Sequence, residues 1–386
     1  METTGVRPSD ELQAILADLK MLAEKPLSAA TAPPKAVYTS DAVAALEQER
    51  IFSKAWLCAG RSDELAKPGD YMSFEHGDQP LIIIRGNDGS LSALANICRH
   101  RMMRLVEGRG NARRFTCPYH AWTYNLEGQL VAAAHMEKTE CFNKADIRLP
   151  AARCEEYLGW IYVSLDADAE PVADRLAELT DRLQAYNMQN YVTIFTEDHV
   201  WDTNWKCLTE NFMEGYHLPV AHKGTVGAYF PVEETVFDDR GSFPHFTSQL
   251  FKKTSNAPVG TAHPANTSLE GEWRNISVMP TVFPCHMYVL APDHLWYLAL
   301  QPDGVGKTRI RYGAAIAPEV LAAQSDPEAY IANAKAFLDD VQLEDKHVVE
   351  GIFAGAKAPM SAPGPLSWLE RENHEFTQYL ARMLCD

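Results

Sequence analysis

The chain lacks the long hydrophobic runs that would carry it across a membrane. Its longest run of large aliphatic residues is Leu81 to Ile84, in a chain of 386 residues, whereas a membrane-spanning helix needs about 20 apolar residues. The first residues, METTGVRPSDELQ, do not show the basic and then apolar segments of a secretory signal. We therefore expect a cytoplasmic protein without a membrane partner.

Positive charge is also scarce. The chain carries 35 lysines and arginines against 52 acidic residues, which gives a net charge of −17. Because nucleic-acid binding requires clustered basic residues that neutralise phosphates, we expect no nucleic-acid partner. Acidic surfaces are common among cytoplasmic enzymes, and an acidic protein is also compatible with a cationic ligand.

Cysteine is sparse, and no segment is repeated or of low complexity. Eight cysteines spread over the whole length are too few for a disulfide scaffold, so most are expected to be buried thiols. No glycine-rich loop for a dinucleotide stands out either. A reaction that uses nicotinamide electrons would therefore require a second protein.

The patterns along the chain predict three parts. Residues 1–57 hold two helices, at 9–25 and at 41–57, the second capped by Asp41. Residues 58–165 alternate short β-rich runs with Gly, Asp and Asn turns, which is typical of an all-β module. Residues 166–386 combine antiparallel strands with flanking helices, so the predicted fold class is α+β. The helices of this last part are expected at 171–188, 204–217, 327–355 and 367–384.

The β module contains two short segments in which cysteine and histidine occur together. They read CRH, with Cys98 and His100, and CPYH, with Cys117 and His120. Thiolate and imidazole together bind zinc or iron. A zinc finger pairs like ligands on one element, whereas each segment here offers one cysteine and one histidine. A [2Fe–2S] cluster needs this set when two thiolates hold one iron and two imidazoles the other. Zinc is the competing metal.

A second group of candidate ligands lies in TENFMEGYHLPVAHKG, residues 209–224. If this segment continues a helix, Glu210, Glu214 and His217 lie on one face. Pro219 is expected to end the helix, and His222 follows as the chain leaves it. Two histidines five residues apart among apolar neighbours are costly to bury without a shared partner. A metal ion is such a partner.

A carboxylate that completes this site is predicted in AFLDDVQLEDKHVVEGIFAG. Read as a helix, its apolar stripe runs through Val341, Val348 and Ile352, and position 345 on the same stripe is an aspartate. A buried, unpaired acid is costly, so a metal explains Asp345. Two histidines and a carboxylate form the facial triad of non-haem Fe(II) oxygenases. The alternatives for Asp345 are a salt bridge or a fraying helix, and Glu344 is the rival ligand.

Taken together, these segments resemble the α subunit of Rieske non-haem iron oxygenases over nearly the whole chain. The C-x-H…C-x-x-H pattern is similar to the Rieske motif of the oxygenase branch, since neither loop has the extra cysteine of the respiratory type. The run from Glu214 to His222 is similar to the family's catalytic motif: an acid, two residues, His, four residues, His. The order of N-terminal helices, Rieske module and helix-grip catalytic domain also matches.

The resemblance implies a set of cofactors and partners. Electrons would come from a separate NAD(P)H-dependent flavin/iron–sulfur reductase, and O2 would be the co-substrate. The cluster potential is expected in the lower part of the ~−150 to +300 mV range. The implied assembly is a homotrimer, in which the cluster of one subunit faces the iron of its neighbour. The implied ligands are Cys98, His100, Cys117 and His120 for the [2Fe–2S] cluster, and His217, His222 and Asp345 for a mononuclear Fe(II).

The resemblance also gives Glu214 a role apart from metal ligation. As the acid three residues before the first catalytic histidine, it would bridge the two metal sites across the subunit interface. It would accept hydrogen bonds from His120 of one subunit and from His217 of the next. The resemblance assigns no role to Glu210, and our expectation for it is a contact to one of the metal ligands.

Glu214 also bears on the substrate, because aromatic-ring dioxygenases usually have aspartate at this position. The segment is closer to the branch that oxidises choline, glycine betaine, carnitine and proline betaine. A trimethylammonium head has no hydrogen to donate and is held by aromatic rings. The candidate cage residues are Tyr229, Phe230, Phe283, Tyr288, Trp296 and Tyr297.

The expected function is hydroxylation of a small quaternary ammonium compound. Attack on an N-methyl carbon would give a carbinolamine that loses formaldehyde, which is an N-demethylation. An aromatic-ring dioxygenase, with a cis-diol product, is the first alternative. A Rieske electron carrier without oxygenase activity is the second, and a zinc-binding interaction protein is the third.

Overall fold

The computed structural model describes residues 10–237, 243–254 and 260–385. By internal contacts the chain divides into two compact units. One unit holds the residues up to Ile51 together with those from Leu176 onward, and the other holds Phe52–Arg175. The limits expected from the sequence, at 57/58 and 165/166, remain predictions.

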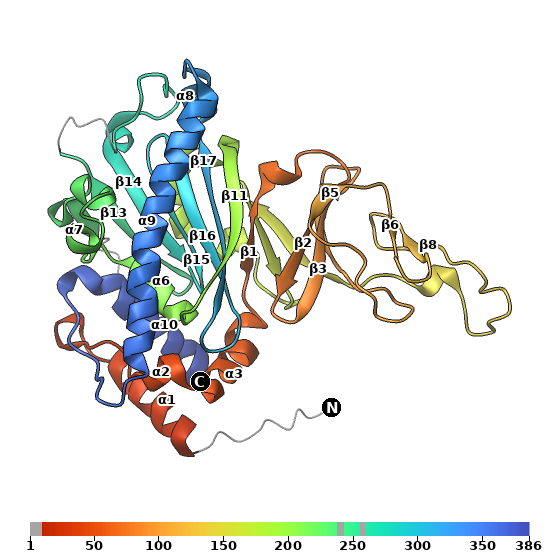
Figure 1. Ribbon diagram of the computed structural model, residues 1–386, viewed down its shortest axis with the longest axis horizontal. Helices are drawn as coiled ribbons and strands as arrows, with labels where there is room; N and C mark the ends of the chain where they lie inside the picture. The colour runs from red at the N-terminus through yellow and green to blue at the C-terminus, as the bar shows by residue number, and fades with distance from the viewer. Residues whose placement is uncertain (1–9, 238–242, 255–259, 386) are drawn as a thin grey trace. The chain divides into compact units, whose positions relative to one another are not determined.

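The unit of residues 52–175 is built from antiparallel strands (Figure 1). Within its described residues, one sheet has the order β1-β10-β9-β4-β3-β2-β5, and a smaller one has the order β6-β7-β8. The expectation of an all-β module is confirmed, apart from the short helix α4 (Val172–Arg175). The strands are β1 (Leu57–Arg61), β2 (Asp70–His76), β3 (Gln79–Arg85), β4 (Leu91–Ala95), β5 (Arg109–Asn111), β6 (Phe115–Thr116), β7 (Thr123–Tyr124), β8 (Leu130–Ala132), β9 (Ala151–Tyr157) and β10 (Trp160–Ser164).

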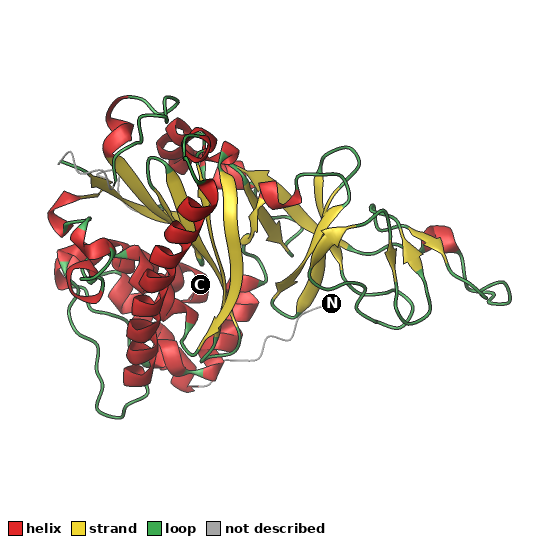
Figure 2. Ribbon diagram, turned by 45° about the horizontal axis from the view of Figure 1, so that its top comes forward, coloured by secondary structure: helices red, strands yellow, loops and turns green. Residues whose placement is uncertain are grey.

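The other unit is an antiparallel sheet with helices against it, as expected for an α+β fold (Figures 1 and 2). Within the described residues the strand order is β11-β17-β16-β15-β14-β13-β12. The strands are β11 (Val192–Trp201), β12 (Thr235–Phe237), β13 (Phe246–Lys252), β14 (Ile276–Val282), β15 (His286–Leu290), β16 (His294–Pro302) and β17 (Thr308–Ile316).

Helices of this unit come from both ends of the chain and from its middle. The long helix α9 crosses one face of the sheet in Figure 1. α1 packs against α10, and its apolar positions are buried as the helical periodicity predicts. The helices are α1 (Asp10–Ala23), α2 (Ala36–Thr39), α3 (Asp41–Glu47), α5 (Ala177–Leu183), α6 (Trp205–Met213), α7 (Leu218–Ala221), α8 (Pro318–Ala322), α9 (Pro327–Ala356) and α10 (Arg371–Cys385).

Two details of the predicted N-terminal helices are wrong. The second helix does not reach residue 57, because α3 ends at Glu47 and a single π-helical turn follows. Its cap is Ser40 rather than Asp41: the Ser40 hydroxyl accepts a hydrogen bond from the Val43 amide, and Asp41 is the first helical residue. The side chain just before the first helical residue is the one that can accept from the free amides at the second and third helical positions.

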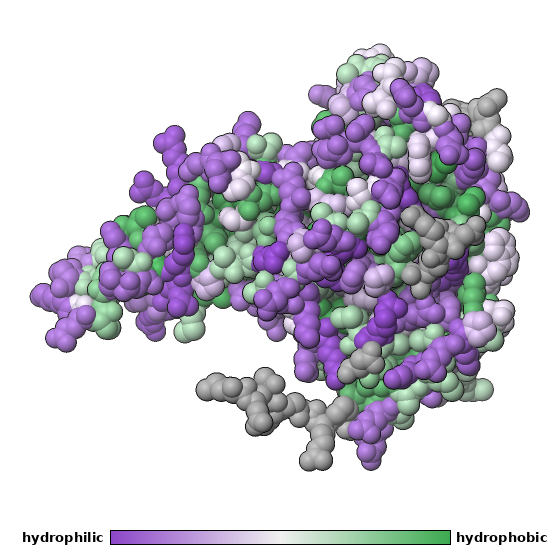
Figure 3. Space-filling view, turned by 180° about the vertical axis from the view of Figure 1, so that it is seen from behind, coloured by the Kyte–Doolittle hydropathy of each residue, from purple (hydrophilic) through white to green (hydrophobic). Residues whose placement is uncertain are grey.

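No helix within the described residues is long and apolar enough to cross a membrane. In the face shown in Figure 3, hydrophilic residues predominate on both units and hydrophobic residues appear in small groups.

A buried ion pair connects α3 to α6. Glu47 and Lys206 are 2% and 0% exposed, and Lys206 Nζ lies 2.6 Å from Glu47 Oε1. The indole nitrogen of Trp205 donates to the other carboxylate oxygen at 2.9 Å. Both charges are therefore compensated, and the pair fixes the start of the helix that leads to the candidate metal site.

We expect Glu47→Ala to lower the free energy of unfolding by about 3–5 kcal/mol, because it leaves the ammonium of Lys206 buried without its partner. Urea denaturation measures this. Glu272→Ala is the control, since its pair with Lys252 is exposed on both sides and such pairs contribute about 1 kcal/mol or less. Equal losses in the two variants would contradict the prediction.

Candidate metal centres and active-site cavity

The two Cys/His segments form loops with the same backbone geometry. In the first loop the Cys98 amide donates to the Met103 carbonyl at 2.8 Å, and the Met102 amide donates to the Cys98 carbonyl at 3.0 Å. Met102 has a φ of 56°, in the left-handed region that non-glycine residues seldom adopt. The second loop repeats each feature, with Cys117, Ala121 (φ 56°) and Trp122 in the corresponding places.

The side chains of these loops fit the predicted ligand set. Cys98 and Cys117 are buried in the core of the unit, whereas His100 and His120 are exposed. The Nδ1 atoms of the two histidines lie 3.1 Å apart, so both imidazoles turn toward one point. Burial raises the pKa of the Cys98 thiol, and a bound cation favours the thiolate form. Their role as [2Fe–2S] ligands remains a prediction that this arrangement supports.

The helix that carries the second motif is shorter than predicted. α6 ends at Met213, and Glu214 is already extended, with φ −117° and ψ 151°. The Glu214 carboxylate accepts hydrogen bonds from the backbone amides of Tyr216 and His217, and such side-chain acceptors compete with helix continuation. The prediction of one helical face for Glu210, Glu214 and His217 is therefore wrong.

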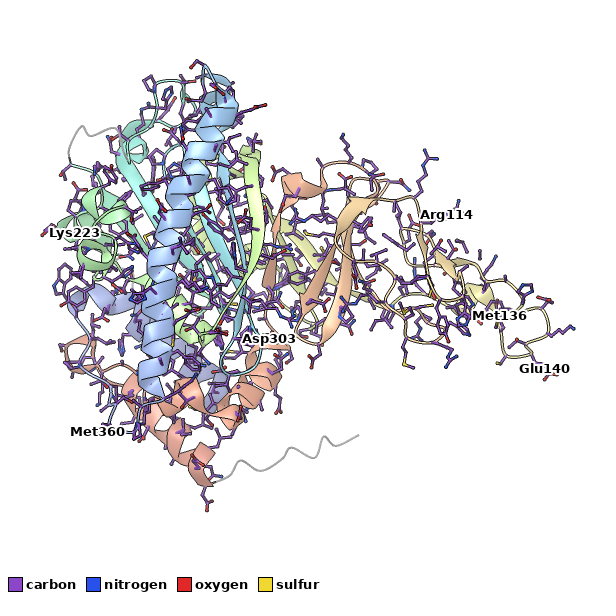
Figure 4. All side chains as sticks on the ribbon, in the orientation of Figure 1. Arg114, Met136, Glu140, Lys223, Asp303 and Met360 are labelled. Carbon is purple, nitrogen blue, oxygen red and sulfur yellow. The ribbon has the colours of Figure 1, made fainter. Side chains whose placement is uncertain are left out.

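Pro219 begins a helix rather than ending one. It lies in the first turn of α7, where proline is tolerated because the amide it lacks would have no helical partner. His217 and His222 are the residues that cap α7 at its two ends. His222 is 1% exposed, and the chain then turns so that Lys223 points outward (Figure 4). The short helix thus separates the two histidines in sequence, while their rings come close together, with centroids 5.1 Å apart.

His217, His222 and Asp345 converge, with their ligand atoms all within 4.8 Å of one another. Asp345 Oδ1 lies 3.0 Å from His222 Nε2 and 3.7 Å from His217 Nε2. Asp345 is 5% exposed on α9, and Asn211 Nδ2 donates to its Oδ1 at 2.7 Å. Two imidazole nitrogens and one carboxylate oxygen facing one point are a suitable set for a divalent iron.

The other ring nitrogen of each histidine contacts a glutamate. His217 Nδ1 lies 2.6 Å from Glu214 Oε1, and His222 Nδ1 lies 2.7 Å from Glu344 Oε2. Thr225 also donates to Glu344. When the Nδ1 positions carry the protons, both Nε2 lone pairs face Asp345, which is the tautomer that a metal requires. Glu344, the rival ligand in the sequence, thus contacts Nδ1 of His222, whereas Asp345 contacts Nε2.

The charge around His222 favours a cation. Burial lowers the pKa of His222, but Asp345 and Glu344 outweigh burial and raise it. A site that attracts a proton in this way also suits a dication, because the same carboxylates would neutralise the metal charge. The residues present therefore fit the mononuclear iron that the family resemblance implies.

The predicted stripe on α9 is right as far as Asp345 and wrong beyond it. The buried positions continue at Val349 and Phe353, while Val348 is half-buried and Ile352 is 48% exposed. Asp345, Val349 and Phe353 are four residues apart, and this spacing keeps them on one helical face just as alternating steps of three and four would. Val348 and Ile352 face a different cavity, described below.

A cavity of about 210 Å³ lies next to the three candidate iron ligands. Its walls come from α6, α7, α9 and one face of the sheet. Seven aromatic residues line it, and no lysine or arginine is present among the described residues of its lining. These aromatic residues are Phe212, Tyr229, Phe230, Phe251, Trp296, Tyr330 and Phe337.

Three of the six predicted cage residues line this cavity, namely Tyr229, Phe230 and Trp296. Tyr288, Tyr297 and Phe283 do not. The cross-strand row Val289–Trp296–Ala314 faces the cavity, whereas the adjacent row Tyr288–Tyr297–Gly313 faces the opposite side, because successive strand residues alternate in direction. Phe283 stacks on Tyr379 of α10 with ring centroids 4.6 Å apart.

A second cavity, of about 410 Å³, lies on the other side of Asn211, Glu214 and His217. These three residues line both cavities. Its remaining walls come from α2, α6, α9, α10 and the segment between α9 and α10. They include Tyr38, Glu210, Glu370 and Asn373. Glu210, whose role the sequence leaves open, thus faces a space that also reaches Glu214.

Comparison with known proteins is consistent with this geometry. Residues 183–386 match the model of the ring hydroxylating alpha subunit (catalytic domain), and residues 55–143 match that of the Rieske [2Fe-2S] domain. The carnitine monooxygenase oxygenase subunit of Acinetobacter pittii is 38% identical over 195 residues, which cover 50% of this chain and 52% of that protein. The glycine betaine monooxygenase oxygenase subunit of Chromohalobacter salexigens is 34% identical over 224 residues, 58% and 50% of the two chains.

These alignments span about half the length of the curated relatives. A solved structure extends further: the quaternary ammonium Rieske monooxygenase CntA in complex with L-carnitine has a TM-score of 0.78 and 25% identity. That match covers 94% of this chain and 98% of the other.

Proposed function

The chain belongs to the family of ring-hydroxylating oxygenase α subunits, and on that basis we propose that it is the terminal oxygenase of a quaternary ammonium monooxygenase system. The observation that supports this most is the cavity beside His217, His222 and Asp345. It combines a site for iron with a lining of seven aromatic residues and, among the described residues, no lysine or arginine. A quaternary ammonium group fits such a lining, because the faces of aromatic rings attract a cation that has no hydrogen to donate.

The residues have separate tasks in this proposal. Cys98, His100, Cys117 and His120 would hold the cluster, and His217, His222 and Asp345 would hold the iron, which supplies O2 activation when it is bound. Glu214 and Glu344 keep the two imidazoles in the required tautomer. The aromatic lining holds the ammonium group and excludes water from the reacting carbon.

The overall change is a balanced monooxygenation. One C–H bond of an N-methyl group becomes a C–O bond, and the second oxygen atom of O2 leaves as water. This consumes two electrons and two protons. The hydroxymethyl ammonium product then breaks its C–N bond to give formaldehyde, a tertiary amine and one proton. A separate NAD(P)H-dependent reductase would provide the electrons, and the assembly would be a homotrimer in which Glu214 bridges the two metal sites.

The test is product analysis with a surrogate reductase. We expect formaldehyde from at least one of choline, glycine betaine and carnitine, and no cis-diol from aromatic acids. Diol formation without amine oxidation would instead support the aromatic-ring dioxygenase. Three irons per loaded chain would exclude an electron carrier with only the cluster, and the reddish-brown absorbance of the cluster would exclude a zinc protein.

Trp296 provides a direct test of the aromatic lining. Trp296→Leu is expected to raise KM for the amine by roughly 2- to 30-fold, since a cation–π contact is worth about 0.5–2 kcal/mol. Steady-state kinetics on the best amine of the panel measure this. The matched control is Trp368→Leu, because Trp368 is 61% exposed and does not line the cavity. An unchanged KM in the Trp296 variant would remove Trp296 from the proposed cage.

A further inference from the structure

Glu210 and Tyr38 form a pair that the assignments above do not use. The Tyr38 hydroxyl lies 2.9 Å from each oxygen of the Glu210 carboxylate. The two residues are 172 positions apart in the chain, on α2 and α6. Their contact is a specific tertiary interaction in the wall of the second cavity, one helical turn before Glu214.

The surroundings of Glu210 favour its neutral form. Burial raises its pKa to about 7, although the Tyr38 hydrogen bond and the Lys206 charge oppose this, and Glu370 adds to the increase. Lys206 itself forms an ion pair with Glu47, with Lys206 Nζ 2.6 Å from Glu47 Oε1. Cys207, Glu214, His217 and Lys35 are the other titratable groups around this cavity, and the residues of α9 facing it are apolar.

The second cavity connects this pair to the metal site. It is large and polar enough to hold several water molecules. It reaches Glu210 on one side and Asn211, Glu214 and His217 on the other. Glu214 contacts His217 Nδ1 at 2.6 Å, and Asn211 contacts Asp345 at 2.7 Å. Water in this cavity would therefore give a proton on Glu210 a route to the wall that separates the two cavities.

We propose that Glu210, held by Tyr38, supplies a proton to the oxygenation reaction through the second cavity. The proposal rests on the oxygenase function proposed above, whose reaction consumes O2, two electrons from the reductase and two protons per hydroxylation. Glu210 gives up its O–H proton to a cavity water and regains one from solvent after each turnover. It does not touch the substrate; it acts through the water of the cavity and through Glu214.

The first test needs neither iron nor substrate. In metal-free protein, the infrared difference spectrum between wild type and Glu210→Gln should contain a carboxylic acid C=O band that disappears as the pH rises through about 7. The comparison must be a difference, because burial also raises the pKa of Glu372. Tyr38→Phe removes a donor that stabilises the carboxylate, so the band should then persist to higher pH. If the band is already absent at pH 6, Glu210 is ionised and the proposal is wrong.

The second test uses loaded enzyme with its cluster reduced beforehand, so that the reductase does not limit the rate. Single-turnover product formation should fall as pH rises through about 7, since the protonated form is needed. In Glu210→Gln it should be at least about 10-fold slower and lack this pH dependence, as expected for loss of a proton donor. Oxygen uptake in this variant should end in peroxide rather than formaldehyde.

The controls separate this role from folding and from the choice of substrate. Tyr38→Phe should shift the pH dependence upward with little change in the limiting rate. Glu272→Gln, on an exposed side chain, should match wild type. Wild-type rate and pH dependence in Glu210→Gln would overturn the proposal. If that variant does not fold, an unchanged pH dependence in Tyr38→Phe would overturn it instead, because the Tyr38 hydrogen bond favours the carboxylate. If wild type oxidises no amine, the proposed function fails, while the infrared titration still decides the state of Glu210.

Discussion

Replacing Asp345 with alanine is expected to abolish substrate oxidation while the visible absorbance of the cluster remains. Asp345 is the carboxylate of the predicted iron site, and its Oδ1 faces both Nε2 atoms at 3.0 and 3.7 Å. Replacing a residue that hydrogen-bonds to a metal ligand already lowers metal affinity or activity by about 10- to 100-fold. Loss of the ligand itself should therefore have a larger effect. Product analysis and iron content of the loaded protein measure the two effects.

Two further variants show whether the effect of Asp345→Ala comes from the loss of a metal ligand. Asn211→Ala removes the 2.7 Å hydrogen bond to Asp345 but leaves the carboxylate in place, so the loss of activity should stay within the 10- to 100-fold range. Asp340→Ala changes an exposed acid on the same helix and should leave turnover unchanged. Full iron content and normal turnover in Asp345→Ala would show that the third ligand lies elsewhere.

Replacing Glu214 with glutamine is expected to slow oxygenation by at least about 10- to 100-fold while both metals stay bound. The Glu214 carboxylate contacts the Tyr216 amide, the His217 amide and His217 Nδ1. A glutamine has one acceptor oxygen in place of two, so it loses part of this set, and it carries no charge. If Glu214 also bridges the two metal sites, the path for electrons is weakened as well.

Glu344→Gln is the matched control for Glu214→Gln. Glu344 makes the same kind of contact to His222 Nδ1 at 2.7 Å, but no bridging role is proposed for it. Its variant should bind iron more weakly and recover turnover when Fe(II) is in excess. Glu214→Gln should not recover, and its reduced cluster should reoxidise slowly in a single turnover. Recovery of both variants by iron would reduce Glu214 to an orienting residue.

The proposed iron site is visible in the sequence because its candidate ligands are polar residues at positions where the pattern predicts burial. Asp345 occupies a buried helix position, and His222 is buried as well. Such positions exclude polar side chains unless a partner compensates them. The contact of Glu344 with His222 cannot be predicted in this way, because an acidic residue next to the buried positions of a helix is common. Only the tertiary structure brings Glu344 to His222.

Other parts depended on contacts that no local pattern reports. α6 ends at Met213 because the Glu214 carboxylate takes the backbone amides that follow it, and nothing in the helical periodicity indicates this. The partner of Glu210 is 172 residues away in the chain. By contrast, the sequence alone indicates that Trp296 and Tyr297 cannot both line the cavity, because neighbouring residues on a strand point to opposite faces.

The matching backbone of the two Cys/His loops has a consequence for electron transfer. Each loop is closed by its own pair of backbone hydrogen bonds and contains one residue at φ 56°, so backbone contacts within the loop itself support its shape. A cluster in this frame could gain or lose one electron with little movement of its protein ligands. A small nuclear rearrangement means a low reorganisation energy, which favours fast transfer in both directions even when the driving force is small.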